Sequence, residues 1–108
     1  MNEVKLTQDL IRFKNLYTRD EGITKFLQKK LTSIGFKCTI IKSKGFNSSK
    51  PALNLYAKYG KSKPHLMTVS HSDVVANIQG WKYPPFAAKI KNGYLYGRGA
   101  QDLSLIHI

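Results

Sequence analysis

The stretch LMTVSHSD, residues 66–73, decides the predicted fold because it joins an apolar run to a polar end. Residues 66–70 predict a short strand buried on both faces, as a central strand of a sheet is. His71 stands at the carboxyl end of this strand, where open α/β sheets place their ligand sites. The sequence therefore predicts an α/β fold with a candidate site at residues 71–73.

Two helices are expected before this strand. The first carries an apolar stripe at spacings of three and four residues, made of Leu6, Leu10, Phe13 and Tyr17. The second is expected to begin near Asp20, with an inward face made of Ile23, Phe26, Leu27, Leu31 and Ile34. Gly35 stands where a left-handed residue would cap this helix.

The remaining segments predict strands and turns. Besides residues 66–70, strands are expected at residues 36–41, 53–59, 87–91 and 94–96. Residues 42–51 predict a loop, and Asn92-Gly93 is the strongest short-range signal for a hairpin. Helices followed by strands, one of them central, predict an α/β or α+β fold with a mixed β-sheet. The α/β arrangement, in which helices flank the sheet, is the one we expect.

The composition limits the class of protein. The chain has 108 residues and one cysteine, Cys38, which excludes a disulfide framework and a multi-cysteine zinc module. This length suits one small domain or one lobe of a larger one. No apolar run approaches the ~20 residues that span a bilayer, and the first residues lack the order of a signal peptide. A cytoplasmic protein with no membrane partner is expected.

The net charge of +12 allows two interpretations. Ten lysines and no carboxylate lie between Gly22 and Ser72, which could attract nucleic acid by neutralising phosphates or could form a solvated surface. Lysine outnumbers arginine 15 to 3, whereas nucleic-acid readers use the arginine fork for phosphates and guanine edges. The solvated surface is favoured and no nucleic-acid partner is expected, with a small basic nucleic-acid-binding domain as the alternative.

Two short patterns carry candidate chemistry. Asp73 follows His71 by two residues, so its carboxylate could accept a hydrogen bond from one imidazole nitrogen while the other binds a metal. A purely structural histidine–carboxylate pair at a strand end is the alternative. In GRGAQD, residues 97–102, two glycines could shape a tight loop that aims Asp102 at a fixed point, or Asp102 could cap a following helix.

Three other features are interpreted as structural. GWKYPPF, residues 80–86, predicts a proline-stiffened loop that packs aromatic side chains onto the core. Cys38 is expected to be a buried, inert thiol in a strand rather than a nucleophile. His65 is expected to be exposed.

Taken together, HSDVV (71–75), WKYPPF (81–86) and NGYLYGRGAQD (92–102) resemble the N-terminal catalytic region of the co-catalytic zinc metallopeptidases of the aminoacylase and carboxypeptidase type. The similarity extends upstream to PALNLYA, residues 51–57, and covers nearly all of this chain. It implies that residues 1–102 are the N-terminal portion of a zinc-peptidase-like catalytic domain, truncated here.

The resemblance implies a role for three residues. His71 would be a terminal ligand of one metal, Asp73 the carboxylate that orients it in the catalytic centre, and Asp102 the carboxylate that bridges two metals. The cofactors would be two divalent ions, zinc in the first place and cobalt as the alternative. The general base and the other ligands of this family are not among these residues, so the fragment alone is expected to be inactive.

The sequences of these motifs are most similar to those of the family members that remove succinate from N-succinyl-diaminopimelate, in the synthesis of diaminopimelate and lysine. The resemblance implies a metal-dependent amide hydrolase with a small N-succinyl amino acid as substrate, homodimeric as the full-length protein. A related deacylase or peptidase, such as one that acts on acetylornithine, is the alternative within the family.

This chain departs from the family's pattern in three places. Ala76 replaces a proline, with a local effect expected. Residues 14–18 replace a proline-rich segment, in a region expected to be remote from the metals. The last six residues, LSLIHI (103–108), match the translation of a sequencing adapter, so we expect them to be a non-native tail and offer no role for His107.

Overall fold

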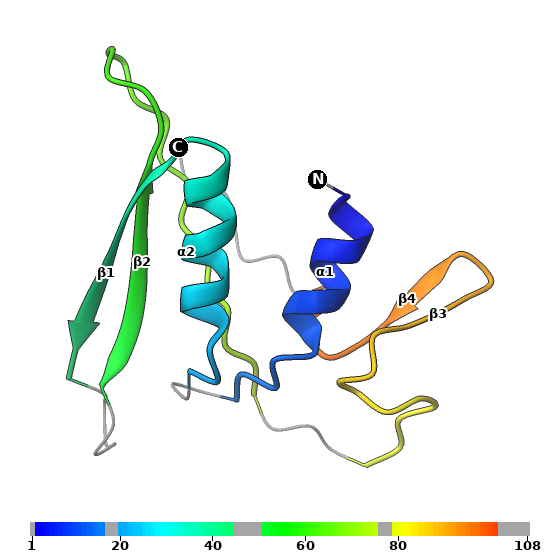
Figure 1. Ribbon diagram of the computed structural model, residues 1–108. Helices are drawn as coiled ribbons and strands as arrows, with labels where there is room; N and C mark the ends of the chain where they lie inside the picture. The colour runs from blue at the N-terminus through cyan, green and yellow to red at the C-terminus, as the bar shows by residue number, and fades with distance from the viewer. Residues whose placement is uncertain (1, 17–19, 45–50, 76–78, 102–108) are drawn as a thin grey trace.

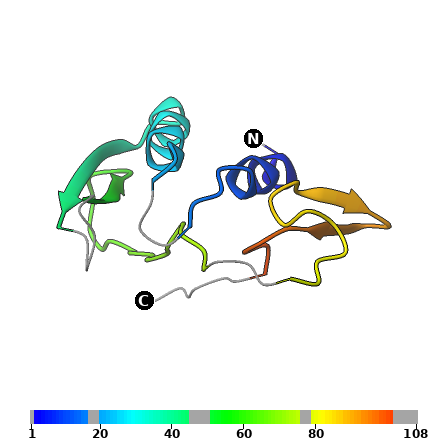
Figure 2. The ribbon, with the colours of Figure 1, turned by 90° about the horizontal axis from the view of Figure 1, so that it is seen from below.

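The computed structural model describes residues 2–16, 20–44, 51–75 and 79–101. Their helices and strands are α1 (Glu3–Ile11), α2 (Ile23–Ser33), β1 (Lys37–Ser43), β2 (Ala52–Lys58), β3 (Lys89–Lys91) and β4 (Tyr94–Tyr96). Helix α2 packs against the β1–β2 hairpin, and α1 lies toward the β3–β4 hairpin (Figure 1). The two helix-and-hairpin groups lie next to each other when the molecule is seen from below (Figure 2). The predicted mixture of helices and strands is confirmed.

Helix α1 begins with a side-chain cap and ends earlier than predicted. The Asn2 side chain accepts a hydrogen bond from the Lys5 amide at 3.0 Å, which satisfies one of the unpaired first-turn N–H groups. Lys5 also pairs with Asp9 one turn later, and its hydrogen bond holds the pKa of Asp9 below its usual value. The helix ends at Ile11 with Arg12 as its C-cap, and Lys14, two residues further on, adopts a left-handed φ of 50°. Tyr17 of the predicted stripe lies outside the described residues.

Both ends of α2 follow the sequence signals. Asp20 accepts hydrogen bonds from the amides of Gly22 (3.0 Å) and Thr24 (3.3 Å), so it anchors the first turn. At the other end the amide of Gly35 bonds to the Thr32 carbonyl (3.1 Å). The next amide, that of Phe36, reaches the Leu31 carbonyl at 3.0 Å. Together with the φ of +100° at Gly35, these two bonds form a Schellman motif, and the predicted glycine cap is confirmed.

Among the described residues the strands form two separate antiparallel pairs rather than the predicted mixed sheet. In the first pair Ile40 lies opposite Leu55, and β2 alternates half-buried and exposed residues over most of its length, as its pattern predicted. In the second, Asn92 and Gly93 have φ values of 52° and 78°, which a two-residue type I′ turn requires. The predicted hairpin at Asn92-Gly93 is therefore confirmed.

The predicted central strand at residues 66–70 does not form. Leu66, Met67 and Val69 are exposed by 73%, 64% and 50%. Within the described part of the chain this segment pairs with no other strand. A strand is buried on both faces only inside a sheet whose two faces are covered by packed elements, and among the described residues this segment is not part of a sheet. The predicted strand was wrong because the apolar run has a high strand propensity, but the described residues include no strand that pairs with it.

The core of the described residues is small. The remaining features that were interpreted as structural agree with the structure in part. Ile11, Ile23 and Ala88 are the buried hydrophobic residues among those described, whereas Ile34, predicted to face inward, is 49% exposed. The half-buried Tyr83 packs edge-on against Tyr96, so the loop of residues 80–86 does place an aromatic ring on the hairpin. His65 is exposed, as expected, whereas Cys38, which was expected to be buried, is half-buried. None of the helices described here could span a membrane.

Candidate metal centre

The structure brings His71 and Asp73 into direct contact. The Nδ1 atom of His71 lies 2.9 Å from the Asp73 main-chain carbonyl and 3.2 Å from its carboxylate oxygen Oδ1. Both side chains are partly open to solvent, with exposed fractions of 46% and 45%. The close approach predicted from the spacing of the two residues is therefore present.

This geometry selects one form of the imidazole. Nδ1 faces two oxygen acceptors, so the neutral ring carries its proton on Nδ1, an assignment made from these neighbours. The lone pair then lies on Nε2, the nitrogen that can bind a metal. A histidine ligand in proteins commonly has this arrangement, because a carboxylate or carbonyl at its other nitrogen fixes the ring and raises its basicity.

The turn of residues 97–101 packs beside the same segment. The Ala100 amide bonds to the Gly97 carbonyl (3.2 Å), which closes the turn. Arg98 is held from two sides, since its amide donates to the Pro85 carbonyl (2.7 Å) and its Nε to the Val75 carbonyl (3.2 Å). Asp102 follows this turn in sequence but lies outside the described residues. The structure thus joins the turn that precedes Asp102 to the segment that follows Asp73.

Gly99 makes the closest approach in this packing, which gives a stability prediction. Its φ is +82°, and a Cβ atom there would lie 2.9 Å from Cγ1 of Val74. Gly99→Ala should lower the free energy of unfolding by about 1–3 kcal/mol, measured by urea denaturation, because it adds backbone strain and a clash.

Gly60→Ala is the matched control for this variant. Gly60 has nearly the same φ, +81°, but no atom within 4 Å of the added Cβ. Gly60→Ala adds the backbone strain without the clash, so it should lower the free energy of unfolding less than Gly99→Ala does. Equal losses in the two variants would contradict the packing of the turn on Val74.

Asn15 is a site-facing residue that the sequence analysis missed. Its side-chain Nδ2 donates to Oγ of Ser72 at 3.4 Å, and its carbonyl accepts the Val74 amide at 2.8 Å. Residues 14–18 were expected to be remote from the metals, but Asn15 contacts the segment that carries His71 and Asp73. No local pattern could have shown this, since the contact joins residues 57 positions apart.

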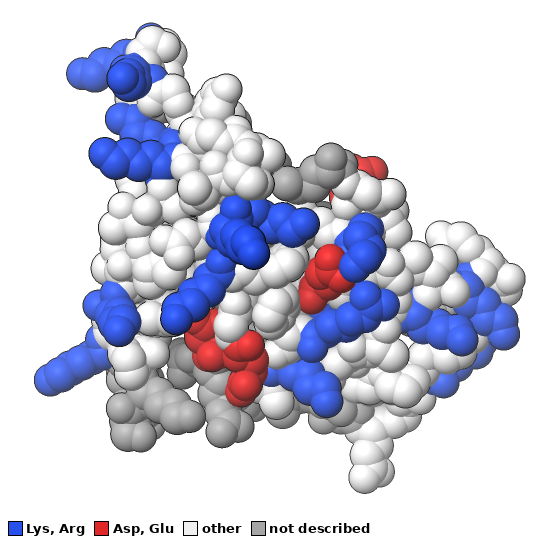
Figure 3. Space-filling view, viewed as in Figure 1, with Lys and Arg blue, Asp and Glu red and all other residues white. Residues whose placement is uncertain are grey.

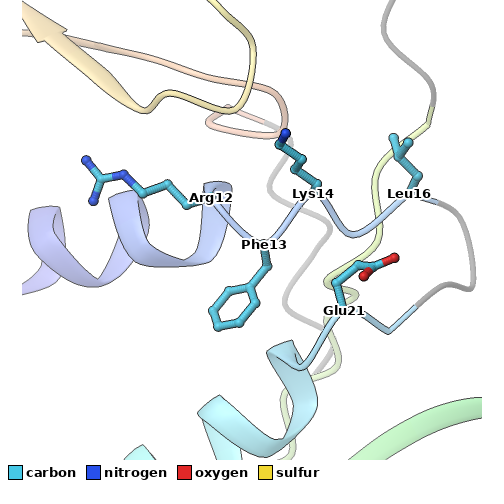
Figure 4. Close-up of a pocket in the computed structure, with 5 residues that line it drawn as sticks. All are labelled: Arg12, Phe13, Lys14, Leu16 and Glu21. Carbon is cyan, nitrogen blue, oxygen red and sulfur yellow. The ribbon is translucent and has the colours of Figure 1, made fainter.

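A pocket opens at the segment between the two helices (Figure 4). It has a volume of about 480 Å³ and is lined by Arg12, Phe13, Lys14, Leu16 and Glu21. The Phe13 ring points toward α2 (Figure 4), where it packs against Phe26 with ring centroids 5.1 Å apart. None of its lining residues belongs to the predicted site, so the pocket is separate from His71 and Asp73.

The donor atoms fit a divalent metal but do not complete a site. Imidazole nitrogen and carboxylate oxygen are both ligands of zinc, which proteins bind with three or four side chains. Among the described residues there is no group of three or more histidine, cysteine or acidic side chains that could hold an ion. A metal centre here needs ligands in addition to His71.

Comparison with known proteins first finds a family model that matches part of the chain. Residues 67–107 match the Peptidase family M20/M25/M40, a range that includes His71, Asp73 and Asp102. The family resemblance predicted from the motifs is confirmed. The boundary at Asp102 and the non-native tail of residues 103–108 stay predictions.

The relatives found among known proteins are more specific. The chain is 50% identical over 104 residues to a succinyl-diaminopimelate desuccinylase of Pelagibacter ubique, an alignment that covers 94% of this chain and 27% of the relative. Proteins with the same name from Zymomonas mobilis and Ehrlichia chaffeensis are 41% and 36% identical, over 93% and 95% of this chain and 26% and 27% of their own lengths. The chain thus resembles about a quarter of a succinyl-diaminopimelate desuccinylase.

Proposed function

We propose that this chain is part of a metal-dependent amide hydrolase that releases succinate from N-succinyl-diaminopimelate, in the synthesis of diaminopimelate and lysine. One observation carries the proposal: the Nδ1 contact of His71 with Asp73 lies inside the segment that matches the peptidase family. The identity of 50% to a desuccinylase supports the substrate. The complete protein, meaning the longer chain of which these residues are a part, would supply the general base and the other ligands.

Each residue of the proposed site has a separate task. Asp73 holds the His71 ring and keeps its proton on Nδ1, so that Nε2 is the ligand atom. Asp102 would bridge two divalent ions, zinc first and cobalt as the alternative. Two such metal ions, when bound, polarise the scissile carbonyl and activate water. The protein's own contribution here is to fix the direction and the protonation of the ligands.

The partner and the location follow from this proposal. The substrate is a small N-succinyl amino acid, and the complete protein is a cytoplasmic homodimer with no membrane or nucleic-acid partner. The lysine-rich surface is then a solvated face, and Figure 3 shows the basic side chains in separate groups over this view of the molecule. A basic nucleic-acid-binding domain gives no reason for the contact between His71 and Asp73.

Hydrolysis by the complete protein tests the proposal. We expect succinate release from N-succinyl-diaminopimelate with a kcat/KM about 100-fold or more above that for acetate release from acetylornithine, because the succinyl carboxylate offers a charged group to recognise. Chelation should remove the activity, and added zinc or cobalt should restore it.

Two outcomes contradict this proposal in different ways. A preference for acetylornithine would replace the substrate but keep the enzyme class. Absence of hydrolysis together with zinc-independent polynucleotide binding that weakens steeply with salt would support the nucleic-acid alternative.

A further inference from the structure

The segment of residues 72–75, which continues from His71, is held from two sides by parts of the chain far away in sequence. On one side Leu16 forms an isolated parallel bridge with Val74, next to the hydrogen bonds of Asn15. On the other side the turn of residues 97–101 bonds to Val75 through Arg98. The position of the segment therefore depends on tertiary contacts, because in the described part of the chain its strand pairing is limited to the isolated bridge at Val74.

Asn15 is the residue that makes most of these contacts. It is 7% exposed, and its side-chain Oδ1 accepts the Glu21 amide at 3.2 Å. Its Nδ2 reaches Ser72 and its carbonyl holds Val74, so one residue ties the start of α2 to both neighbours of Asp73. A buried amide with donor and acceptor both satisfied is costly to replace by an apolar group.

The backbone on which Asn15 sits is itself closed by a short turn. The Leu16 amide bonds to the Lys14 carbonyl at 2.8 Å, which makes a three-residue turn centred on Asn15. The turn follows the left-handed residue Lys14. This turn fixes the main chain of Asn15. The Asn15 side chain therefore contacts Ser72 from a fixed backbone position.

We propose that Asn15 is a positioning residue for the metal ligand His71. It fixes Ser72 and Val74, the two chain neighbours of Asp73, and thereby holds the Asp73 oxygens against Nδ1 of His71. Its effect on hydrolysis rests on the function proposed above, whereas its effect on the imidazole does not. Without Asn15 the ring is free to populate the form with the proton on Nε2, which cannot bind a metal through that atom.

The test uses Asn15→Ala, Ser72→Ala and the double variant in the complete protein. In the zinc-free protein, ¹⁵N NMR should show His71 mainly protonated on Nδ1, and Asn15→Ala should raise the share protonated on Nε2. Zinc affinity, measured by competition with a chelator, should fall about tenfold. This is the lower end of the loss seen when a residue that orients a metal ligand is replaced. The kcat should fall while KM stays unchanged.

Coupling between the two residues separates positioning from general destabilisation. The double variant should bind zinc no more weakly than Asn15→Ala alone, because both changes break the same hydrogen bond. Thr24→Ala is the matched control, since Thr24 is also a buried polar residue, 5% exposed, but lies on α2. It should lower stability and leave the His71 proton and the zinc affinity as they are.

A folded Asn15→Ala protein with the parent's imidazole form and zinc affinity would overturn the proposal. Failure of the proposed function gives a different result. In that case the unaltered protein shows no zinc-dependent hydrolysis, while the NMR comparison still decides whether Asn15 controls the His71 ring.

Discussion

Replacing His71 with alanine in the complete protein should reduce the kcat for succinate release by about 1,000-fold or more. The imidazole is the only side chain of the described residues placed to bind a metal while a carboxylate orients it. In the proposed centre, its loss would remove a ligand from the metals that would stabilise the charge developing during amide cleavage. The measurement is the initial rate of succinate release at saturating substrate, with the zinc content of each variant determined in parallel.

His65→Ala is the matched control for this variant. His65 lies on the same segment, is exposed, and has no part in the proposed site. It should keep the parent's rate and zinc content. Near-normal turnover of His71→Ala would remove His71 from the site and with it the proposed centre.

The second large effect is expected from Asp73→Asn. This change keeps the shape of the side chain and the main-chain carbonyl at 2.9 Å, but it removes the negative charge beside Nδ1. Carboxylate partners of histidine ligands typically contribute 10–100-fold to metal affinity or activity. We expect a loss of about that size in both, smaller than that of His71→Ala because the carbonyl still accepts the Nδ1 proton.

Asp9→Asn provides the comparison for loss of a carboxylate elsewhere. Asp9 pairs with Lys5 and Arg12 on the surface of α1, so its replacement should leave zinc affinity unchanged. Equal zinc affinity in Asp73→Asn and the parent would mean that the contact with His71 is structural only, which is the alternative interpretation of the pair.

The parts of the fold that were predictable are those decided by local chemistry. The Schellman cap at Gly35 and the turn at Asn92-Gly93 need residues that tolerate positive φ, and the sequence provides them at the right positions. The contact of His71 with Asp73 also depends on a spacing of only two residues. Each of these features could be derived from neighbouring residues alone.

The features that could not be predicted depend on distant contacts. The apolar run at residues 66–70 has the composition of a buried strand, yet it is exposed, because among the described residues it belongs to no sheet whose faces are covered. Asn15 reaches the site across 57 positions of sequence. Propensity and periodicity do not encode such pairings, so the tertiary position of the site required the structure.

The most direct test of the account is a crystal structure of the complete protein with zinc, with the metals located by anomalous scattering. We expect a zinc ion about 2.0–2.1 Å from Nε2 of His71, with Nδ1 still against Asp73 and Asp102 shared between two ions. Zinc bound elsewhere, or bound to Nδ1 of His71 with Asp73 turned away, would contradict it.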